Sequence, residues 1–408
     1  MQETSVCRIC DGVVTEFIDF GKQPLSDRFA SPSDSSPEPF FRLAVGSCSS
    51  CTMVQLLEEM PRESMFHEDY PYHSSGSSWM REHFTATAQR FIDTELTGPD
   101  PFIVELGCND GVMLSTIARA GIRHLGVEPS GGVADVAATH GVRVRKDFFE
   151  ESTAAGILTD DGQADVIFAA NTLCHIPYMA SVLRGVATLL APNGVFVFED
   201  PYFGDIVRKT SFDQIYDEHF YFFTARSVQE MAARYGLELV DVERLPVHGG
   251  EVRYTLARAG ARQPTAAVAE LLAEEEATRL TERETLEGFA RTVLKIRDDL
   301  VALLRELKAA GKTVAGYGAT AKSATVLNFC GIDSELISYV SDTTPAKQGR
   351  VTPGSHIPVV PPSVFADGYP DYAVLFAWNH KEEILAKEEA FQRSGGRWIG
   401  YVPEVHVI

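Results

Sequence analysis

The stretch Val104-Glu105-Leu106-Gly107-Cys108-Asn109-Asp110-Gly111 decides the fold of this chain. An apolar run at residues 102–104 predicts a strand before the turn, and residues 112–120 predict a helix after it. Glycine lets the backbone bend tightly and lets a ligand approach it closely. A strand, an acidic residue, a glycine-bearing turn and a helix in this order indicate an α/β domain that holds a ligand against the turn.

The chain around this turn alternates helical stretches with short apolar strands. Strands are predicted at residues 102–104, 124–127, 142–145, 164–169, 194–199, 238–244 and 253–256. From about residue 79 to residue 260, this alternation indicates a doubly wound α/β domain. Residues 263–311 are rich in Ala, Leu, Glu and Arg and predict one or two long connecting helices. A second α/β unit follows, with a predicted helix at 323–330 and predicted strands at 313–315, 336–340 and 373–377.

The overall charge argues against a nucleic-acid partner. The chain carries 57 acidic and 36 basic residues, a net charge of -21, and its Lys and Arg residues are not clustered. A protein that binds a duplex needs clustered Lys and Arg to displace counterions from phosphate. No apolar run approaches the roughly 18 residues of a membrane span, and the first residues do not resemble a signal peptide. We therefore expect a cytoplasmic protein without a membrane partner and, since no feature indicates an oligomer interface, a monomer.

Four of the seven cysteines form two C-x2-C pairs, Cys7/Cys10 and Cys48/Cys51. Each pair can place two thiolates on one side of a tight knuckle, and two knuckles complete the closed tetrahedral site of a structural zinc ion. The alternative is four unrelated thiols, which the doubled spacing disfavours. An odd cysteine count argues against a secreted disulfide framework. Acidic residues surround the knuckles, so a nucleic-acid finger is not expected.

The glycine turn resembles motif I of the S-adenosylmethionine (SAM)-dependent methyltransferases, whose pattern is acidic-x-Gly-x-Gly-x-Gly. Glu105, Gly107 and Gly111 match this pattern, and Asn109 stands in place of the middle glycine. The resemblance implies that the turn lies against the amino-acid portion of SAM. A nicotinamide dehydrogenase is the competing interpretation, and the missing middle glycine disfavours it.

Further cofactor contacts are predicted where successive strands end. Glu128 ends the second strand, where an acidic side chain can accept both ribose hydroxyl hydrogens. Asp147 and Phe148 end the third strand, and we expect them to bind the adenine amino group and to pack on the ring. Asn171 follows the fourth strand.

Acid–base groups are dense in the segment Tyr216-Asp217-Glu218-His219, and His175 follows the fourth strand. Histidine takes up a proton near neutral pH, an adjacent carboxylate can orient it, and a tyrosine can donate to a developing oxyanion. Any one of these residues alone is more simply a packed polar side chain. As a cluster they predict an active site.

In their order along the chain, these motifs resemble the three-domain sugar C-methyltransferases of antibiotic deoxysugar pathways. The resemblance also rests on the stretches 248–253 and 316–322, and it covers essentially the whole chain. Within this family, the chain most resembles the C-3′-methyltransferases that act on dTDP-3-amino-2,3,6-trideoxy-4-keto-glucose. These enzymes lie on the route to nitrosugars such as tetronitrose. The implied fold is α/β: a small zinc-binding domain (1–72), a Rossmann-like SAM methyltransferase domain (73–262), and a helical connector with a second Rossmann-like domain (263–408).

The resemblance implies that a base removes the C-3′ proton of a dTDP-linked 4-keto-deoxysugar and that the resulting carbanion attacks the methyl group of SAM. By this resemblance His219, supported by Glu218, is the base. Tyr216 and His175 would flank the C-4′ oxygen or the amino group, and Tyr70 would reach into the cleft. A rival assignment makes Tyr216 the proton carrier and His219 its partner.

The nucleotide of the substrate is expected between the middle and C-terminal domains. The turn 316–322 presents N–H groups at a helix start and ends in a lysine, which predicts a diphosphate cradle containing Gly318 and Lys322. Arg253 can meet phosphate or sugar, or can equally be a surface arginine beside a hairpin turn. Three alternatives stay open: an acceptor with a C-3′ hydroxyl, a zinc-ribbon binding protein with a degenerate SAM fold, and a nicotinamide oxidoreductase.

Overall fold

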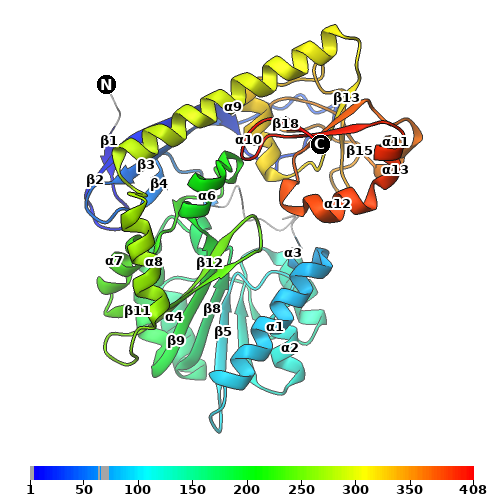
Figure 1. The fold of residues 1–408 in the computed structure, drawn as a ribbon. Helices are drawn as coiled ribbons and strands as arrows, with labels where there is room; N and C mark the ends of the chain where they lie inside the picture. The colour runs from blue at the N-terminus through cyan, green and yellow to red at the C-terminus, as the bar shows by residue number, and fades with distance from the viewer. Residues whose placement is uncertain (1–3, 63–64, 66–72) are drawn as a thin grey trace.

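A computed structural model describes residues 4–62, 65 and 73–408. Three sheets, one for each predicted unit, are joined by helices (Figure 1). The N-terminal sheet and the C-terminal sheet lie side by side under one long helix, and the middle sheet lies below both. Among the described residues, no helix has both the length and the hydrophobicity that a bilayer span requires.

The N-terminal sheet is antiparallel and takes its last strand from the middle of the chain. Its order is β1-β2-β3-β4-β10. The strands are β1 (Thr4–Val6), β2 (Val13–Pro24), β3 (Phe40–Cys48), β4 (Val54–Leu56) and β10 (Tyr221–Phe222). Because β10 begins two residues after His219, the predicted acid–base segment is anchored to the zinc-binding unit.

The middle sheet has seven strands in the order β11-β12-β9-β8-β5-β6-β7, and only β12 runs against its neighbours. All seven predicted strands are confirmed, with ends that differ by a few residues. They are β5 (Phe102–Leu106), β6 (Arg123–Val127), β7 (Val144–Arg145), β8 (Ala164–Ala170), β9 (Leu190–Pro201), β11 (Leu237–Leu245) and β12 (Glu251–Arg258).

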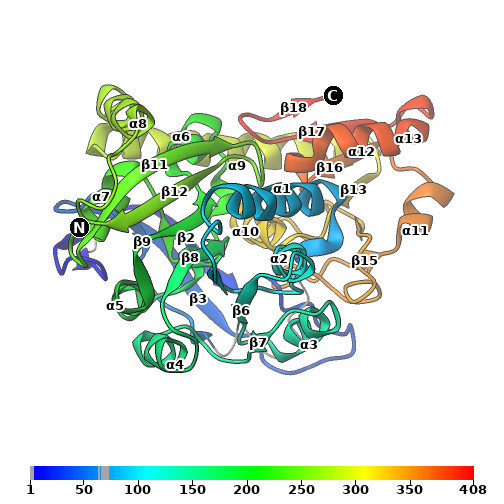
Figure 2. The same ribbon diagram turned by 90° about the horizontal axis from the view of Figure 1, so that it is seen from below.

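Helices cover both faces of this sheet, as the view from below shows (Figure 2). Strand β5 alternates accordingly: Phe102, Val104 and Leu106 enter one hydrophobic cluster and Ile103 enters the other. The predicted helix 112–120 is α2. The helices of this unit are α1 (Ser78–Thr94), α2 (Leu114–Arg119), α3 (Gly131–Thr139), α4 (Glu151–Asp161), α5 (Met179–Leu189), α6 (Phe203–Lys209) and α7 (Ala225–Ala233).

Two helices form the predicted connector, α8 (Ala266–Ala277) and α9 (Arg283–Ala309). Helix α9 is the long helix that crosses the molecule in Figure 1. Its buried residues recur every three or four positions, as expected for one face of an amphipathic helix. They are Leu286, Phe289, Val293, Ile296, Leu300, Leu304 and Leu307.

The C-terminal sheet has the order β15-β14-β13-β16-β17-β18. Its strands are β13 (Val314–Tyr317), β14 (Val340–Ser341), β15 (Val359–Val360), β16 (Tyr372–Leu375), β17 (Arg397–Gly400) and β18 (His406–Val407). Its helices are α10 (Ala321–Cys330), α11 (Pro362–Asp367), α12 (Lys381–Lys387) and α13 (Glu389–Arg393).

Two predictions for this unit need correction. Only the last residue of the predicted strand 336–340 is in a strand, because Asp333 starts a turn: its carbonyl accepts hydrogen bonds from the N–H groups of Leu336 and Ile337. The predicted glycine turn is also shorter than expected. Thr320 caps helix α10, which therefore begins at Ala321 and includes Lys322 in its first turn.

Candidate active site

A cavity of about 690 Å³ opens where the three units meet. It lies at the carboxyl ends of β5, β6 and β8, the usual place for a ligand in an open α/β sheet. The N-terminal unit contributes Asp27 and Arg62, and the C-terminal unit contributes residues 319–322, 342–345 and Lys347.

The glycine turn forms a tight floor at one end of this cavity. Gly107 has φ +67, and an added Cβ would lie 2.5 Å from Thr172 Oγ1. Asn109 has φ 49, in the left-handed region that Asn tolerates better than most residues. Its N–H donates to Glu128 Oε2 at 2.9 Å, and its Oδ1 accepts from Ser74 N at the same distance. Asn109 therefore keeps the glycine-like backbone and adds a hydrogen bond that glycine cannot make.

The remaining motif residues lie beneath the turn. An added Cβ on Gly111 would lie 2.8 Å from Ala137 Cβ, so this position allows α3 to pack closely. Glu105 is 4% exposed and does not line the cavity. Burial raises the pKa of Glu105 well above its usual value, and Asp110 and Glu128 add to the rise.

Of the two predicted adenine contacts, Phe148 and Asp147, only Phe148 lines the cavity. Phe148 lines the cavity, and the Arg62 guanidinium stands 4.2 Å from its ring centroid. Asp147 does not line the cavity, because it bonds Arg145 Nη2 at 3.2 Å. Asn171 lines the cavity with φ 48, and its N–H donates to Glu199 O at 2.7 Å.

The predicted acid–base residues Tyr216, Glu218, His219 and His175 all line the same cavity. The rings of His175 and His219 are stacked with centroids 5.1 Å apart, and the Tyr216 ring centroid lies 4.1 Å from that of His219. Tyr70 lies outside the described residues.

Protonation states follow from burial. Burial lowers the pKa of His175 to about 4. Burial, then His175 and Lys322, lower the pKa of His219 well below its usual value, so both imidazoles are neutral at neutral pH. His219 Nδ1 lies 2.8 Å from the Gln214 carbonyl, which can only accept; Nδ1 thus carries the hydrogen and Nε2 the lone pair. Burial raises the pKa of Tyr216, which stays a phenol.

Of the predicted substrate contacts, Lys322 lines the cavity and Arg253 does not. Burial lowers the pKa of Lys322, opposed by the charges of Asp213 and Glu251. Gly318 has φ +91 and packs under the cavity wall, where an added Cβ would lie 2.8 Å from Ala377 Cβ.

Arg253 is 6% exposed and does not line the cavity. Both predicted alternatives, a substrate contact and a surface arginine, are therefore wrong. It bonds Glu199 Oε1 at 2.7 Å, Glu243 Oε2 at 2.9 Å and Thr87 Oγ1 at 2.9 Å. It therefore ties β12 to helix α1. Burial with two carboxylates from neighbouring strands is the physical reason why it does not reach the cavity.

Several lining residues carry no sequence signal. Lys347 bonds Asp27 Oδ1 at 3.1 Å, across 320 positions of the chain. Its Nζ also donates to Ala319 O at 3.0 Å and lies 4.5 Å from the Phe29 ring centroid. Such a contact forms only when the N-terminal and C-terminal units pack together. Neither the spacing of residues nor the hydrophobic periodicity of the sequence can predict it.

Three family models match the chain in succession: "Putative zinc binding domain" over residues 7–66, "Methyltransferase domain" over 79–242 and "C-methyltransferase C-terminal domain" over 246–403. The chain is 35% identical to C-methyltransferase NovU of Streptomyces niveus over 98% of this chain and 96% of that protein. The chain belongs to the C-methyltransferase family.

More distant similarities are confined to part of this C-methyltransferase. A ubiquinone biosynthesis O-methyltransferase of Ralstonia nicotianae is 34% identical over 24% of this chain and 41% of that protein. Among solved structures, geranyl diphosphate C-methyltransferase from Streptomyces coelicolor aligns over 45% of this chain and 85% of that chain, with 14% identity and a TM-score of 0.32. Similarity to a C-methyltransferase over the full length argues against two earlier alternatives: a zinc-ribbon binding protein with a degenerate SAM fold, and a nicotinamide oxidoreductase.

The C-methyltransferase uses SAM, and its residues fit that cofactor. Gly107 leaves a cradle that a Cβ would fill, and the Glu128 carboxylate lies in the cavity wall at the end of β6. Phe148 supplies an apolar face for a ring at the end of β7. When bound, SAM supplies an electrophilic methyl group.

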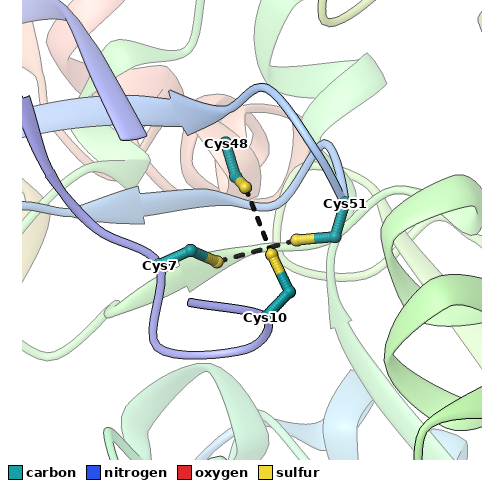
Figure 3. A group of neighbouring side chains, drawn as sticks. All are labelled: Cys7, Cys10, Cys48 and Cys51. Carbon is teal, nitrogen blue, oxygen red and sulfur yellow. Dashed lines mark hydrogen bonds between the residues drawn. The ribbon is translucent and has the colours of Figure 1, made fainter. Parts of the chain in front are cut away.

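The four N-terminal cysteines fit a zinc ion. Their sulfurs converge from two knuckles, and no disulfide joins them (Figure 3). The Sγ atoms of Cys7 and Cys51 are 3.6 Å apart, and those of Cys10 and Cys48 are 3.4 Å apart. Tetrahedral zinc with bonds of about 2.3 Å places its sulfurs about 3.8 Å apart. Gln55 Nε2 also donates to Cys7 Sγ at 3.2 Å, which orients that thiolate.

Proposed function

We propose that this C-methyltransferase moves a methyl group from SAM to C-3′ of a dTDP-linked 3-amino-4-keto-2,3,6-trideoxyhexose, in the biosynthesis of an antibiotic nitrosugar. The observation that carries the proposal is His219: a neutral imidazole with its Nε2 lone pair unprotonated, beside a phenol and a second imidazole in the shared cavity. Methylation of a carbon next to a ketone needs such a base, because the C–H proton must be removed before the carbon can attack the methyl group.

His219 takes the C-3′ proton of the 4-ketosugar, and Glu218 supports the imidazolium that forms. Tyr216 donates to the C-4′ oxygen as it becomes an oxyanion, because its raised pKa keeps the hydroxyl hydrogen in place. His175 flanks the same oxygen or the C-3′ amine. The C-3′ carbanion then attacks the methyl group, and S-adenosylhomocysteine is released.

The diphosphate belongs at the other end of the cavity, where Lys322 lies in the first turn of α10. Helix N-termini and a lysine both favour a phosphate group. Ala319 lines the cavity there, and Gly318 packs beneath it. The nucleotide thereby bridges the middle and C-terminal units.

Product analysis tests this proposal. The protein is incubated with SAM and a panel of dTDP-4-ketosugars that carry either an amine or a hydroxyl at C-3′. We expect a gain of one methyl group on carbon, in mass and fragmentation spectra, with the amino sugar only. Methylation of the hydroxyl sugar alone would replace the acceptor, and a methyl group on nitrogen or oxygen would overturn the enolate chemistry.

A further inference from the structure

Asp213 belongs to the segment that leads into Tyr216–His219, yet its partners come from the C-terminal unit. The side chain is fully buried in the short helix η4 (Phe212–Gln214). Its Oδ2 accepts hydrogen bonds from Trp378 Nε1 at 2.6 Å and from the Tyr401 hydroxyl at 2.7 Å. Two donors from one unit therefore converge on a single carboxylate oxygen of another, in the short geometry of charge-assisted hydrogen bonds.

The charge of this carboxylate is matched by Lys322. Burial raises the pKa of Asp213, and Lys322, Tyr401 and Trp378 act against that rise. Lys322 lies on the first turn of α10, its Nζ 5.7 Å from the Trp378 ring centroid. The C-terminal unit thus supplies both the donors and the countercharge.

The Trp378 ring also packs closely against the turn at residues 248–250, which precedes β12. An added Cβ on Gly249 would come within 2.6 Å of the Trp378 ring, so the residue at this position has to be glycine. Gln214 Nε2 donates to His248 O at 2.6 Å in the same turn. The turn, η4 and Trp378 therefore form one interlocked contact.

The carbonyl of Gln214, the residue after Asp213, is the partner of His219 Nδ1 at 2.8 Å. One residue further on, the Ile215 carbonyl accepts a hydrogen bond from Thr325 Oγ1 of α10 at 2.9 Å. The C-terminal unit therefore holds the backbone on both sides of the carbonyl that selects the His219 tautomer. A tautomer fixed in this way leaves Nε2 available to take a proton.

We propose that Asp213 is a positioning residue through which the C-terminal unit orients His219, an inference that rests on the proposed function. Hydrogen bonds from Trp378 and Tyr401 hold the Asp213 carboxylate, and the carboxylate in turn holds η4 in place. The Gln214 carbonyl at the end of η4 then orients the His219 imidazole through its hydrogen bond to Nδ1. The C-terminal unit would then contribute to proton abstraction without touching the C-3′ carbon.

Exchange of the C-3′ proton with solvent deuterium tests this inference. The full-length protein is incubated in D2O with S-adenosylhomocysteine and the dTDP-3-amino-4-ketosugar, and deuterium uptake is followed by mass spectrometry. Tyr401→Phe combined with Trp378→Phe removes both hydrogen-bond donors and leaves an aromatic ring at each position. We expect exchange and kcat to fall by about tenfold or more, the factor that one charge-assisted hydrogen bond represents. The KM for SAM should stay unchanged.

Tyr317→Phe is the matched control, because its buried hydroxyl also donates to a carboxylate, Glu388 Oε1 at 2.7 Å, but away from the cavity. Equal exchange by wild type and the double variant would overturn the inference alone. A matching loss in Tyr317→Phe, or a rise in the KM for SAM equal to the loss of kcat, would show a merely structural role. Absence of exchange by the unaltered protein would instead overturn the proposed function, and the inference with it.

Discussion

His219 is set apart from an ordinary surface histidine by two physical facts: its burial and its carbonyl partner. Burial disfavours the charged imidazolium, and the nearby His175 ring and Lys322 ammonium lower the pKa of His219 further. The Gln214 carbonyl fixes which nitrogen bears hydrogen. A weakly basic but correctly oriented imidazole suits a reaction in which the proton must also be given up again.

The lowered pKa values predict where the pH profile falls. A base acts only while it is unprotonated, so a pKa below the usual 6.5 moves the acid limb to lower pH. We expect kcat/KM for the sugar nucleotide to remain level through pH 6.5 and to fall only in more acidic buffer. Initial rates across a buffer series check this, and an acid limb above pH 6.5 would contradict it.

His219→Ala should lower kcat by about 100-fold or more, the usual contribution of a positioned general base. SAM affinity, measured by calorimetry, should be unchanged, because the residues proposed to hold the cofactor, Gly107, Glu128 and Phe148, stay in place. The matched control is His406→Ala, in the edge strand β18. If His219→Ala keeps substantial activity while Tyr216→Phe does not, the proton carrier is Tyr216.

At the level of secondary structure, the pairing of β10 with β4 links the zinc-binding unit to the acid–base segment. Tyr221 pairs with Gln55 and Phe222 with Val54, and Ser26 N donates to Asp217 Oδ1 at 3.1 Å. Gln55 in turn donates to Cys7 Sγ. A short path therefore leads from the metal-binding thiolates to the residues beside His219.

Zinc removal should therefore cost activity more than it costs cofactor binding. Cys48→Ser is expected to lower zinc content and kcat together, while calorimetry still detects SAM binding by the middle unit. Cys330→Ser is the matched control, since Cys330 is a buried cysteine of α10 outside the zinc knuckles. Full activity in a zinc-free Cys48→Ser protein would contradict this role.

Elements with strong local patterns could be predicted from the sequence. The middle strands are continuous apolar runs between turns, and the zinc knuckles and the glycine turn are local chemistry. The strand predicted at 336–340 failed because apolar residues there serve a turn begun by Asp333. Arg253 and Asp147 were expected at the cavity but are held by ion pairs that the chain makes only once folded.

At the scale of the whole molecule, the cavity belongs to no single unit. Asp27 and Lys347 close it between the N-terminal and C-terminal units, and an isolated bridge pairs Ala30 with Val351 nearby. The sequence could not indicate this closure, because these residues lie far apart and belong to no motif. Tyr216, Glu218 and His219 could be predicted because they share one short segment, and His175 because it follows the fourth strand.

Lys347→Met should loosen this closure. We expect the KM for the sugar nucleotide to rise by about three- to tenfold, the cost of one partly buried polar contact. The KM for SAM should not change, because Lys347 lies at the end of the cavity where the C-terminal unit contributes. Lys312→Met, which breaks the exposed Lys312–Asp371 pair at 3.0 Å, is the control. A rise in both KM values, or in neither, would contradict the assignment.

The shared sheet sets a rule for building hybrid enzymes from members of this family. Exchanging residues 1–72 alone would bring a foreign β4 against a resident β10, and the mismatch would fall two residues from His219. Hybrids that are meant to change acceptor preference should therefore take β4 and the segment around β10 from the same parent enzyme. Crossover points in the α8–α9 connection avoid this junction.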